Sequence, residues 1–128
     1  VHLDVMHEPF PDQVNHIQIG KETDLFIVVP ATANTIAKLA HGLADNMVTA
    51  TALALPRFVP KLLAPAMNTK MYDHPATQSN LKTLENYGYT IISPKDSLLA
   101  CGDTGRGALA DLETILQEIK DKLHEQTL

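Results

Sequence analysis

The sequence predicts an α/β fold, in which a parallel sheet carries helices on both faces within a single domain. Three short apolar runs with the composition of buried strands alternate with segments of helical periodicity, in the order βαβαβα. The chain has 128 residues, enough to bury a core without a disulfide or a structural metal. Sheets of this kind need right-handed crossovers, and they bind ligands beyond the carboxyl ends of their strands.

The first half of the chain predicts one strand and one long helical stretch. The run DLFIVVP (24–30) has the unbroken hydrophobicity of a strand covered on both faces. NTIAKLAHGLAD (34–45) follows with helical spacing, and DNMVTATALAL continues the helix as far as Pro56. The apolar face predicted for this helix consists of Ile36, Leu39, Ala40 and Leu43.

The second half predicts two further strands and two helices. KLLAPA (61–66) and YTIISP (89–94) are the strands. The helix between them, HPATQSNLKTLENYG, has Pro75 near its start and Gly88 just past its end, which are common positions for these residues. The last helix begins at a capping Asp111. Its predicted apolar stripe consists of Leu112, Ile115, Leu116, Ile119 and Leu123.

Composition excludes several classes of function. The net charge of -5 and the ten dispersed Lys and Arg residues argue against a nucleic-acid-binding surface. No apolar run approaches the roughly 20 residues of a membrane span, so no membrane partner is expected. The single cysteine excludes an internal disulfide and fits a reducing, cytoplasmic setting. The spacing of the six histidines predicts no metal site.

Two segments leave strands at the predicted ligand-binding edge, PATANT (30–35) and PAMNTKMY (65–72). Both begin with proline, which ends a strand ladder, and both contain an asparagine with small neighbours. Small residues let the backbone approach a flat ligand, and an amide side chain both donates and accepts hydrogen bonds. The alternative is that both segments are ordinary strand-to-helix turns in which Asn34 and Asn68 are local caps.

These segments resemble motifs of the homo-oligomeric flavin-containing cysteine decarboxylases. PATANT is similar to the family's Pro-Ala-Ser-Ala-Asn-Thr motif, and PAMNTKMY to its Pro-x-Met-Asn-x-x-Met-Trp motif. NHIQIG (15–20) resembles the active-site histidine segment, and LLACGDTGRGALAD (98–111) the substrate clamp of the phosphopantothenoylcysteine decarboxylases. Thr32 replaces a serine and Tyr72 a tryptophan, and both keep a polar group.

The resemblance also predicts what the chain lacks. The family begins with a strand and a Gly/Ser turn that hold the flavin phosphate, and no segment here matches them. We therefore expect residues 1–128 to form one flavoprotein decarboxylase domain without that N-terminal part, and to bind FMN more weakly than a chain that has it.

The resemblance implies a Rossmann-like or flavodoxin-like fold and an FMN cofactor. It implies redox-neutral decarboxylation of 4'-phospho-N-pantothenoylcysteine to 4'-phosphopantetheine, a step of coenzyme A biosynthesis. In that chemistry FMN takes a hydride equivalent from the cysteine moiety, and the resulting thioaldehyde is the electron sink for loss of carbon dioxide. The hydride then returns and an acid protonates carbon. The resemblance also implies a homotrimer, or a multiple of trimers, with flavin sites between subunits.

Catalytic roles are carried over to three residues. His16 is expected to be a base or a charge that orients the substrate carboxylate, which Asn68 binds. Cys101 is expected to donate the proton to carbon, and the three glycines that follow it predict a loop that moves. The implied flavin contacts are Thr32, Ala33, Asn34, Thr35 and Ala66. The implied substrate contacts are Asn68, Met71 and Gly102.

Three alternatives stay open at this point. His16 would be an ordinary helix-surface residue and Cys101 a structural loop residue if the resemblance did not hold there. The same fold also serves oxidative decarboxylation of a peptide's C-terminal cysteine, in enzymes that lack the Cys-Gly clamp. Related regulatory proteins bind a phosphatase, and these would not need His16, Asn68 and Cys101 together.

Overall fold

The computed structural model describes residues 23–98 and 104–127, and in this part of the chain it contains two sheets. The first is parallel, with strand order β1-β2-β3, and the second is an antiparallel pair, β4-β5. The strands are β1 (Phe26–Ala31), β2 (Lys61–Pro65), β3 (Tyr89–Ile91), β4 (Lys95–Leu98) and β5 (Thr104–Ala108). The register of β2 places Leu62 opposite Ile27 on one side and Thr90 on the other.

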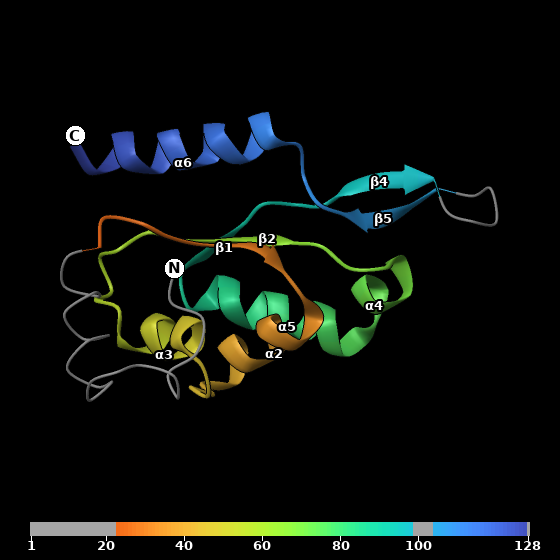
Figure 1. Ribbon diagram of the computed structural model, residues 1–128, viewed down its shortest axis with the longest axis horizontal. Helices are drawn as coiled ribbons and strands as arrows, with labels where there is room; N and C mark the ends of the chain where they lie inside the picture. The colour runs from red at the N-terminus through yellow and green to blue at the C-terminus, as the bar shows by residue number, and fades with distance from the viewer. Residues whose placement is uncertain (1–22, 99–103, 128) are drawn as a thin grey trace.

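Helices cover both faces of the parallel sheet, as predicted (Figure 1). One face carries α2 (Ala33–His41), α3 (Met47–Ala54) and α5 (Pro75–Asn86), and the other carries α6 (Leu112–Thr127). A short helix, α4 (Thr69–Asp73), lies near the β4–β5 hairpin and contacts β5. Of the helices described, none combines the length and the hydrophobicity that crossing a bilayer requires.

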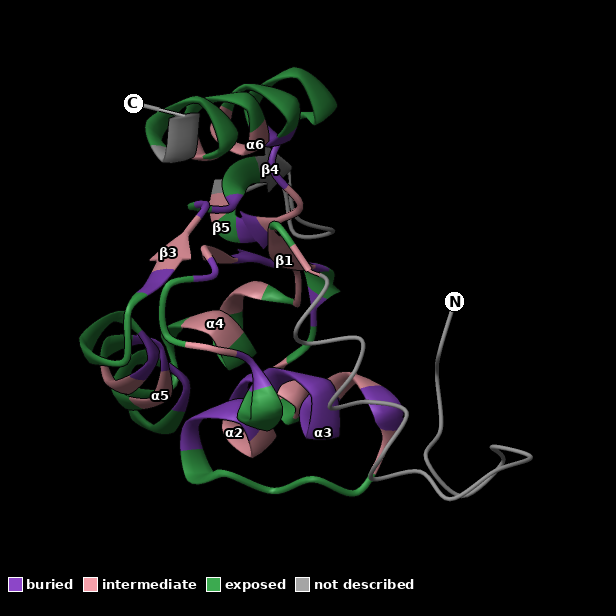
Figure 2. Ribbon diagram, turned by 90° about the vertical axis from the view of Figure 1, so that its left-hand side faces the viewer, coloured by how far each residue is buried: buried purple, intermediate pink, exposed green. Residues whose placement is uncertain are grey.

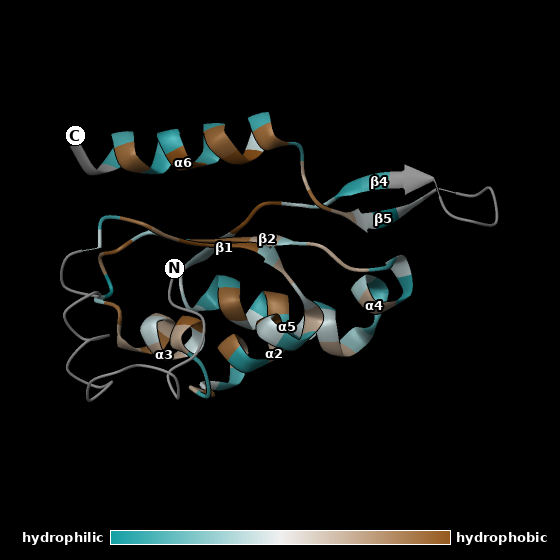
Figure 3. Cartoon of the chain, viewed as in Figure 1, coloured by the Kyte–Doolittle hydropathy of each residue, from teal (hydrophilic) through white to brown (hydrophobic). Residues whose placement is uncertain are grey.

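The core has one layer on each side of the sheet. Leu63 packs with the α2 and α5 side, and Leu62 with the α6 side; both are fully buried. Successive strand residues point to opposite faces, so the apolar run of β2 reflects cover on both sides. Figure 2 shows buried residues on the inward sides of α2 and α3, and β2 is buried from Leu62 onward. Figure 3 shows hydrophobic residues along β1 and β2.

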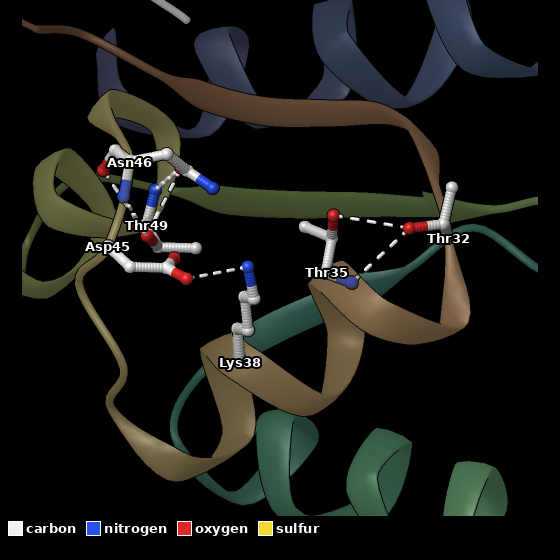
Figure 4. A network of polar contacts seen from close by, with 6 residues as sticks. All are labelled: Thr32, Thr35, Lys38, Asp45, Asn46 and Thr49. Carbon is white, nitrogen blue, oxygen red and sulfur yellow. Dashed lines mark hydrogen bonds and ion pairs between the residues drawn. The ribbon is translucent and has the colours of Figure 1, made fainter. Parts of the chain in front are cut away.

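The sequence predicted one long helix over residues 34–55. The structure has two helices there, α2 and α3, so this prediction is wrong. Gly42 ends α2 in the left-handed region, with φ 70°. Asn46 then starts α3 through a reciprocal capping box with Thr49 (Figure 4). Leu43 therefore lies in the loop between the helices and is 54% exposed, instead of belonging to the apolar face.

The antiparallel hairpin is also a correction to the predicted element order. It lies between β3 and α6, where the sequence predicted a mobile loop, and it places Gly105 and Gly107 in a strand. KDSL and TGRGA carry almost no apolar alternation, so their pattern gives no strand signal. These two segments are held as strands by their pairing with each other and by the contact between β5 and α4.

The apolar stripe predicted for α6 is right at two positions and wrong at three. Ile115 is buried, and Ile119 is half-buried, against the core cluster that contains Leu62. Leu112, Leu116 and Leu123 are exposed in the described part of the chain. At the start of the helix, the Asp111 carboxylate accepts a hydrogen bond from Lys95 Nζ at 2.7 Å and so joins the helix to β4.

Leu63→Ala tests the importance of the central strand for stability. The side chain is fully buried between β2 and the helices, so we expect the free energy of unfolding to fall by about 2–5 kcal/mol in urea titration. Leu112→Ala, at a position 69% exposed, is the matched control and should change it by less than about 0.5 kcal/mol. Similar losses in both variants would contradict this assignment of the core.

Candidate functional site

The two segments that follow β1 and β2 lie side by side at the carboxyl edge of the sheet. Ala31 pairs with Pro65 across the two strands, and the Ala66 N–H donates to the Ala31 carbonyl at 3.0 Å. The start of α2 and the loop 66–68 are therefore neighbours. The sequence predicted this common edge, and the structure confirms it.

The start of α2 is held by threonine, which leaves Asn34 free. Thr32 Oγ1 accepts a hydrogen bond from the Thr35 N–H at 3.2 Å and donates to Thr35 Oγ1 at 3.2 Å (Figure 4). Asn34 is exposed and makes no side-chain hydrogen bond within the described residues, so its interpretation as a cap is wrong. The first turn of α2 contains no acidic residue. Its free N–H groups and partial positive charge therefore suit an anionic or polar ligand.

Asn68 is a cap, but capping uses only half of its amide. Its Oδ1 accepts a hydrogen bond from the Met71 N–H at 2.9 Å and starts α4. The two N–H donors of Nδ2 are not used within the described part of the chain, and the residue is exposed. The turn interpretation is thus confirmed for Asn68, and it is compatible with donation to a bound carboxylate.

The methionines of this motif have different environments. Met67 is half-buried and, together with Tyr72, packs against the core on the α2 and α5 side. Met71 lies on α4 and is 46% exposed. A substrate-contacting position for Met71 is compatible with this exposure and stays a prediction.

The hairpin contacts the same loop, which the sequence did not predict. The Met67 N–H donates to the Gly107 carbonyl at 2.9 Å, and β5 contacts α4. The strands are also linked through Arg106 and Asp96, whose Nε–Oδ1 distance is 3.4 Å. An isolated glycine in a strand is a signal for close approach of another backbone, and Gly107 is such a residue.

An ion pair stabilises the other end of α2. Lys38 Nζ lies 2.7 Å from Asp45 Oδ2, across the loop that separates α2 from α3 (Figure 4). The hydrogen bond from Lys38 lowers the pKa of the Asp45 carboxyl. This pair lies near the C-terminal end of α2. It stabilises the connection between α2 and α3 and takes no part in the candidate site at the carboxyl edge of the sheet.

Three of the predicted site residues, His16, Cys101 and Gly102, lie outside the described residues. Among the other histidines, His74 is the residue before α5, and its Nδ1 accepts a hydrogen bond from the Ala76 N–H at 3.0 Å. Within residues 23–98 and 104–127 no group of three His, Cys, Asp or Glu side chains could hold a metal ion.

Comparison with known proteins identifies the family. The family model described as Flavoprotein matches residues 2–124. The chain belongs to the Flavoprotein family. This flavoprotein is 59% identical over 123 residues to a protein of Streptococcus mutans named probable phosphopantothenoylcysteine decarboxylase. The match covers 96% of this chain and 69% of that protein.

Two solved structures support the same relationship for this flavoprotein. One is a PPC decarboxylase with a cysteine-to-serine mutation, complexed with pantothenoylaminoethenethiol; it has a TM-score of 0.78 and 38% identity. The alignment covers 83% of this chain and 58% of that one. The other is the FMN binding protein AtHal3, with a TM-score of 0.76, 39% identity, and coverage of 83% and 57%. The flavoprotein chain thus spans less than two thirds of these two structures.

Proposed function

We propose that this protein is an FMN-dependent phosphopantothenoylcysteine decarboxylase that converts 4'-phospho-N-pantothenoylcysteine to 4'-phosphopantetheine in coenzyme A biosynthesis. The observation that carries the proposal is the 59% identity to the Streptococcus mutans protein named probable phosphopantothenoylcysteine decarboxylase. The structure adds the hydrogen bond from the Met67 N–H to the Gly107 carbonyl. It joins the segment that presents Asn68 to the hairpin whose two strands are connected by the segment containing Cys101. We assign the reaction to the cytoplasm, where a reducing environment keeps a thiol free.

The residues at the carboxyl edge fit a flavin. Ala33 and Ala66 are small, Thr32 and Asn34 are exposed, and the first turn of α2 carries no carboxylate that would repel an anionic cofactor. We propose that Thr32, Ala33, Asn34, Thr35 and Ala66 contact the FMN. When bound, FMN supplies the removal and return of a hydride equivalent, which a protein side chain cannot do.

The protein's own side chains bind the substrate and move protons. The Asn68 amide donors hold the substrate carboxylate, while its carbonyl oxygen stays on the Met71 N–H and fixes the direction of those donors. Met71 and Gly102 are the further substrate contacts that we propose. His16 is the base, or the charge that orients the carboxylate, and the Cys101 thiol protonates carbon in the final reduction.

Release of carbon dioxide from 4'-phospho-N-pantothenoylcysteine by the purified protein tests this function. We expect release without an added oxidant, and a yellow protein from which mass spectrometry identifies FMN. The serine analogue of the substrate is the control, because an alcohol in place of the thiol should not form the thiocarbonyl that stabilises loss of carbon dioxide. Absence of release from the cysteine substrate by flavin-loaded protein would contradict the proposal.

We further propose that the active unit is a homotrimer or a multiple of trimers. Large apolar side chains outside the core support an interface, since Leu43, Leu53 and Phe58 are 54%, 62% and 77% exposed. We expect light scattering on the active, flavin-loaded protein to give a mass that is a multiple of three chains. A monomeric mass with full activity would contradict this assembly.

A further inference from the structure

Gly107 occupies a place that no other residue type fits. Its φ is 148°, a conformation that L side chains rarely adopt. A Cβ atom added there would lie less than 3.0 Å from the Met67 carbonyl oxygen, and 3.3 Å from the Asn68 carbonyl carbon. Both atoms are backbone, so neither can turn away as the end of a flexible side chain can. Strand β5 and the loop 66–68 therefore meet backbone to backbone.

The hairpin register explains why Gly107 faces this loop. Lys95 pairs with Ala108 and Asp96 with Arg106, so no residue of β4 lies opposite Gly107. This is the two-against-one count of a β-bulge, in which the extra residue leaves the ladder. The Gly107 carbonyl accepts the Met67 N–H at 2.9 Å. The bulge thus turns one peptide of β5 away from its own hairpin and toward the segment that presents Asn68.

The other two positive-φ glycines of the described residues show that conformation and close approach are separate properties. Gly42 has φ 70° and Gly88 has φ 100°, and neither would bring an added Cβ within 4 Å of another atom. Both follow helix ends, where a left-handed residue is an ordinary C-cap feature. Of these three glycines, only Gly107 combines the conformation with a backbone neighbour.

We propose that Gly107 is a positioning residue that sets the distance between the β4–β5 hairpin and Asn68. This inference rests on the proposed function, because it assigns Asn68 and the hairpin to one substrate site. Asn68 is fixed from one side by capping α4 and from the other by the hydrogen bond of its neighbour, Met67, to Gly107. A side chain at position 107 would push β5 away from the loop while the Asn68 cap persists.

Gly107→Ala in the flavin-loaded protein tests the proposal through the products. We expect kcat for 4'-phosphopantetheine formation to fall at least about tenfold, about 1.4 kcal/mol. FMN affinity should stay unchanged within about twofold, because four of the five proposed flavin contacts lie at the start of α2 and the fifth, Ala66, is held by its hydrogen bond to Ala31. The share of oxidised ene-thiol in the product should rise, with an equal amount of FMN left reduced, since the final protonation and reduction depend on the position of the hairpin. A loss of general stability would not change this ratio.

Gly88→Ala is the matched control. It imposes a side chain at positive φ but meets no neighbour, so it should lower the melting temperature without changing the product ratio. A Gly107→Ala protein with wild-type kcat and product ratio, or a Gly88→Ala protein with the same shift in ratio, would overturn the proposal.

If Gly107→Ala does not fold, the proposal can still be tested by amide hydrogen exchange at Met67 in the unaltered protein. We expect slow exchange at Met67, because its N–H is bonded to Gly107; exchange as fast as in an exposed loop would overturn the proposal. This measurement needs no substrate. Failure of the proposed function, seen as no carbon dioxide from the unaltered protein, is therefore distinguishable from failure of the inference.

Discussion

Asn68→Asp is expected to remove at least about 99% of turnover while leaving the fold intact, a loss of about 2.7 kcal/mol in transition-state stabilisation. Aspartate keeps the oxygen that accepts the Met71 N–H, and it is as good a helix cap as asparagine. It loses both amide donors, however, and places a negative charge against the substrate carboxylate. Steady-state kinetics, the flavin spectrum and the melting temperature measure these effects separately.

Two further variants isolate the cause of this loss. Asn68→Ser keeps a capping oxygen and adds no charge, so it should lose less turnover than Asn68→Asp if repulsion contributes. Asn86→Asp makes the same chemical change at an exposed position at the end of α5 and should leave turnover unchanged. Turnover of Asn68→Asp within about tenfold of the unaltered protein would reduce Asn68 to a turn residue.

Cys101→Ser is expected to stop the reaction after decarboxylation. A serine hydroxyl is a far weaker acid than a thiol, whose ordinary pKa is about 8.5, and so it donates a proton to carbon poorly. Carbon dioxide release should persist, because Asn68 and His16 are unchanged. The variant should accumulate reduced FMN together with an oxidised ene-thiol that mass spectrometry finds two hydrogens lighter than 4'-phosphopantetheine.

Carbon dioxide release provides the internal control, since a misfolded variant would lose both half-reactions together. Formation of 4'-phosphopantetheine by Cys101→Ser at a near-normal rate would contradict the role of Cys101 as the acid.

Much of the parallel sheet and its helices could be predicted from the sequence, because local pattern and tertiary environment agree there. The run KLLAP is apolar throughout, and β2 is buried on both faces from Leu62 onward. The hairpin could not be predicted in this way, since KDSL and TGRGA lack the alternation of a half-buried strand. Gly42 was a visible stop signal inside a helical pattern, but the small apolar residues that continue after it suggested an uninterrupted helix.

The location of the candidate site at one edge of the sheet could be predicted, and its geometry could be predicted only in part. PATANT and PAMNTKMY were assigned to one edge from the strand order alone, and the hydrogen bond from Ala66 to Ala31 confirms it. The division of the Asn68 amide between capping and free donors depends on where α4 begins, which the sequence does not specify. Contact between Gly107 and Met67 joins residues 40 positions apart. A glycine in a strand signals that another backbone approaches closely, but it does not identify the partner.

An oxygen-free single-turnover experiment with flavin-loaded protein tests the redox-neutral reaction most directly. The protein, in excess over 4'-phospho-N-pantothenoylcysteine, is followed by its flavin absorbance until carbon dioxide release is complete, and the product is weighed by mass spectrometry. We predict oxidised FMN at the end and a product whose mass equals the substrate minus carbon dioxide. Reduced FMN together with a product two hydrogens lighter would contradict the account and would assign this protein to oxidative decarboxylation.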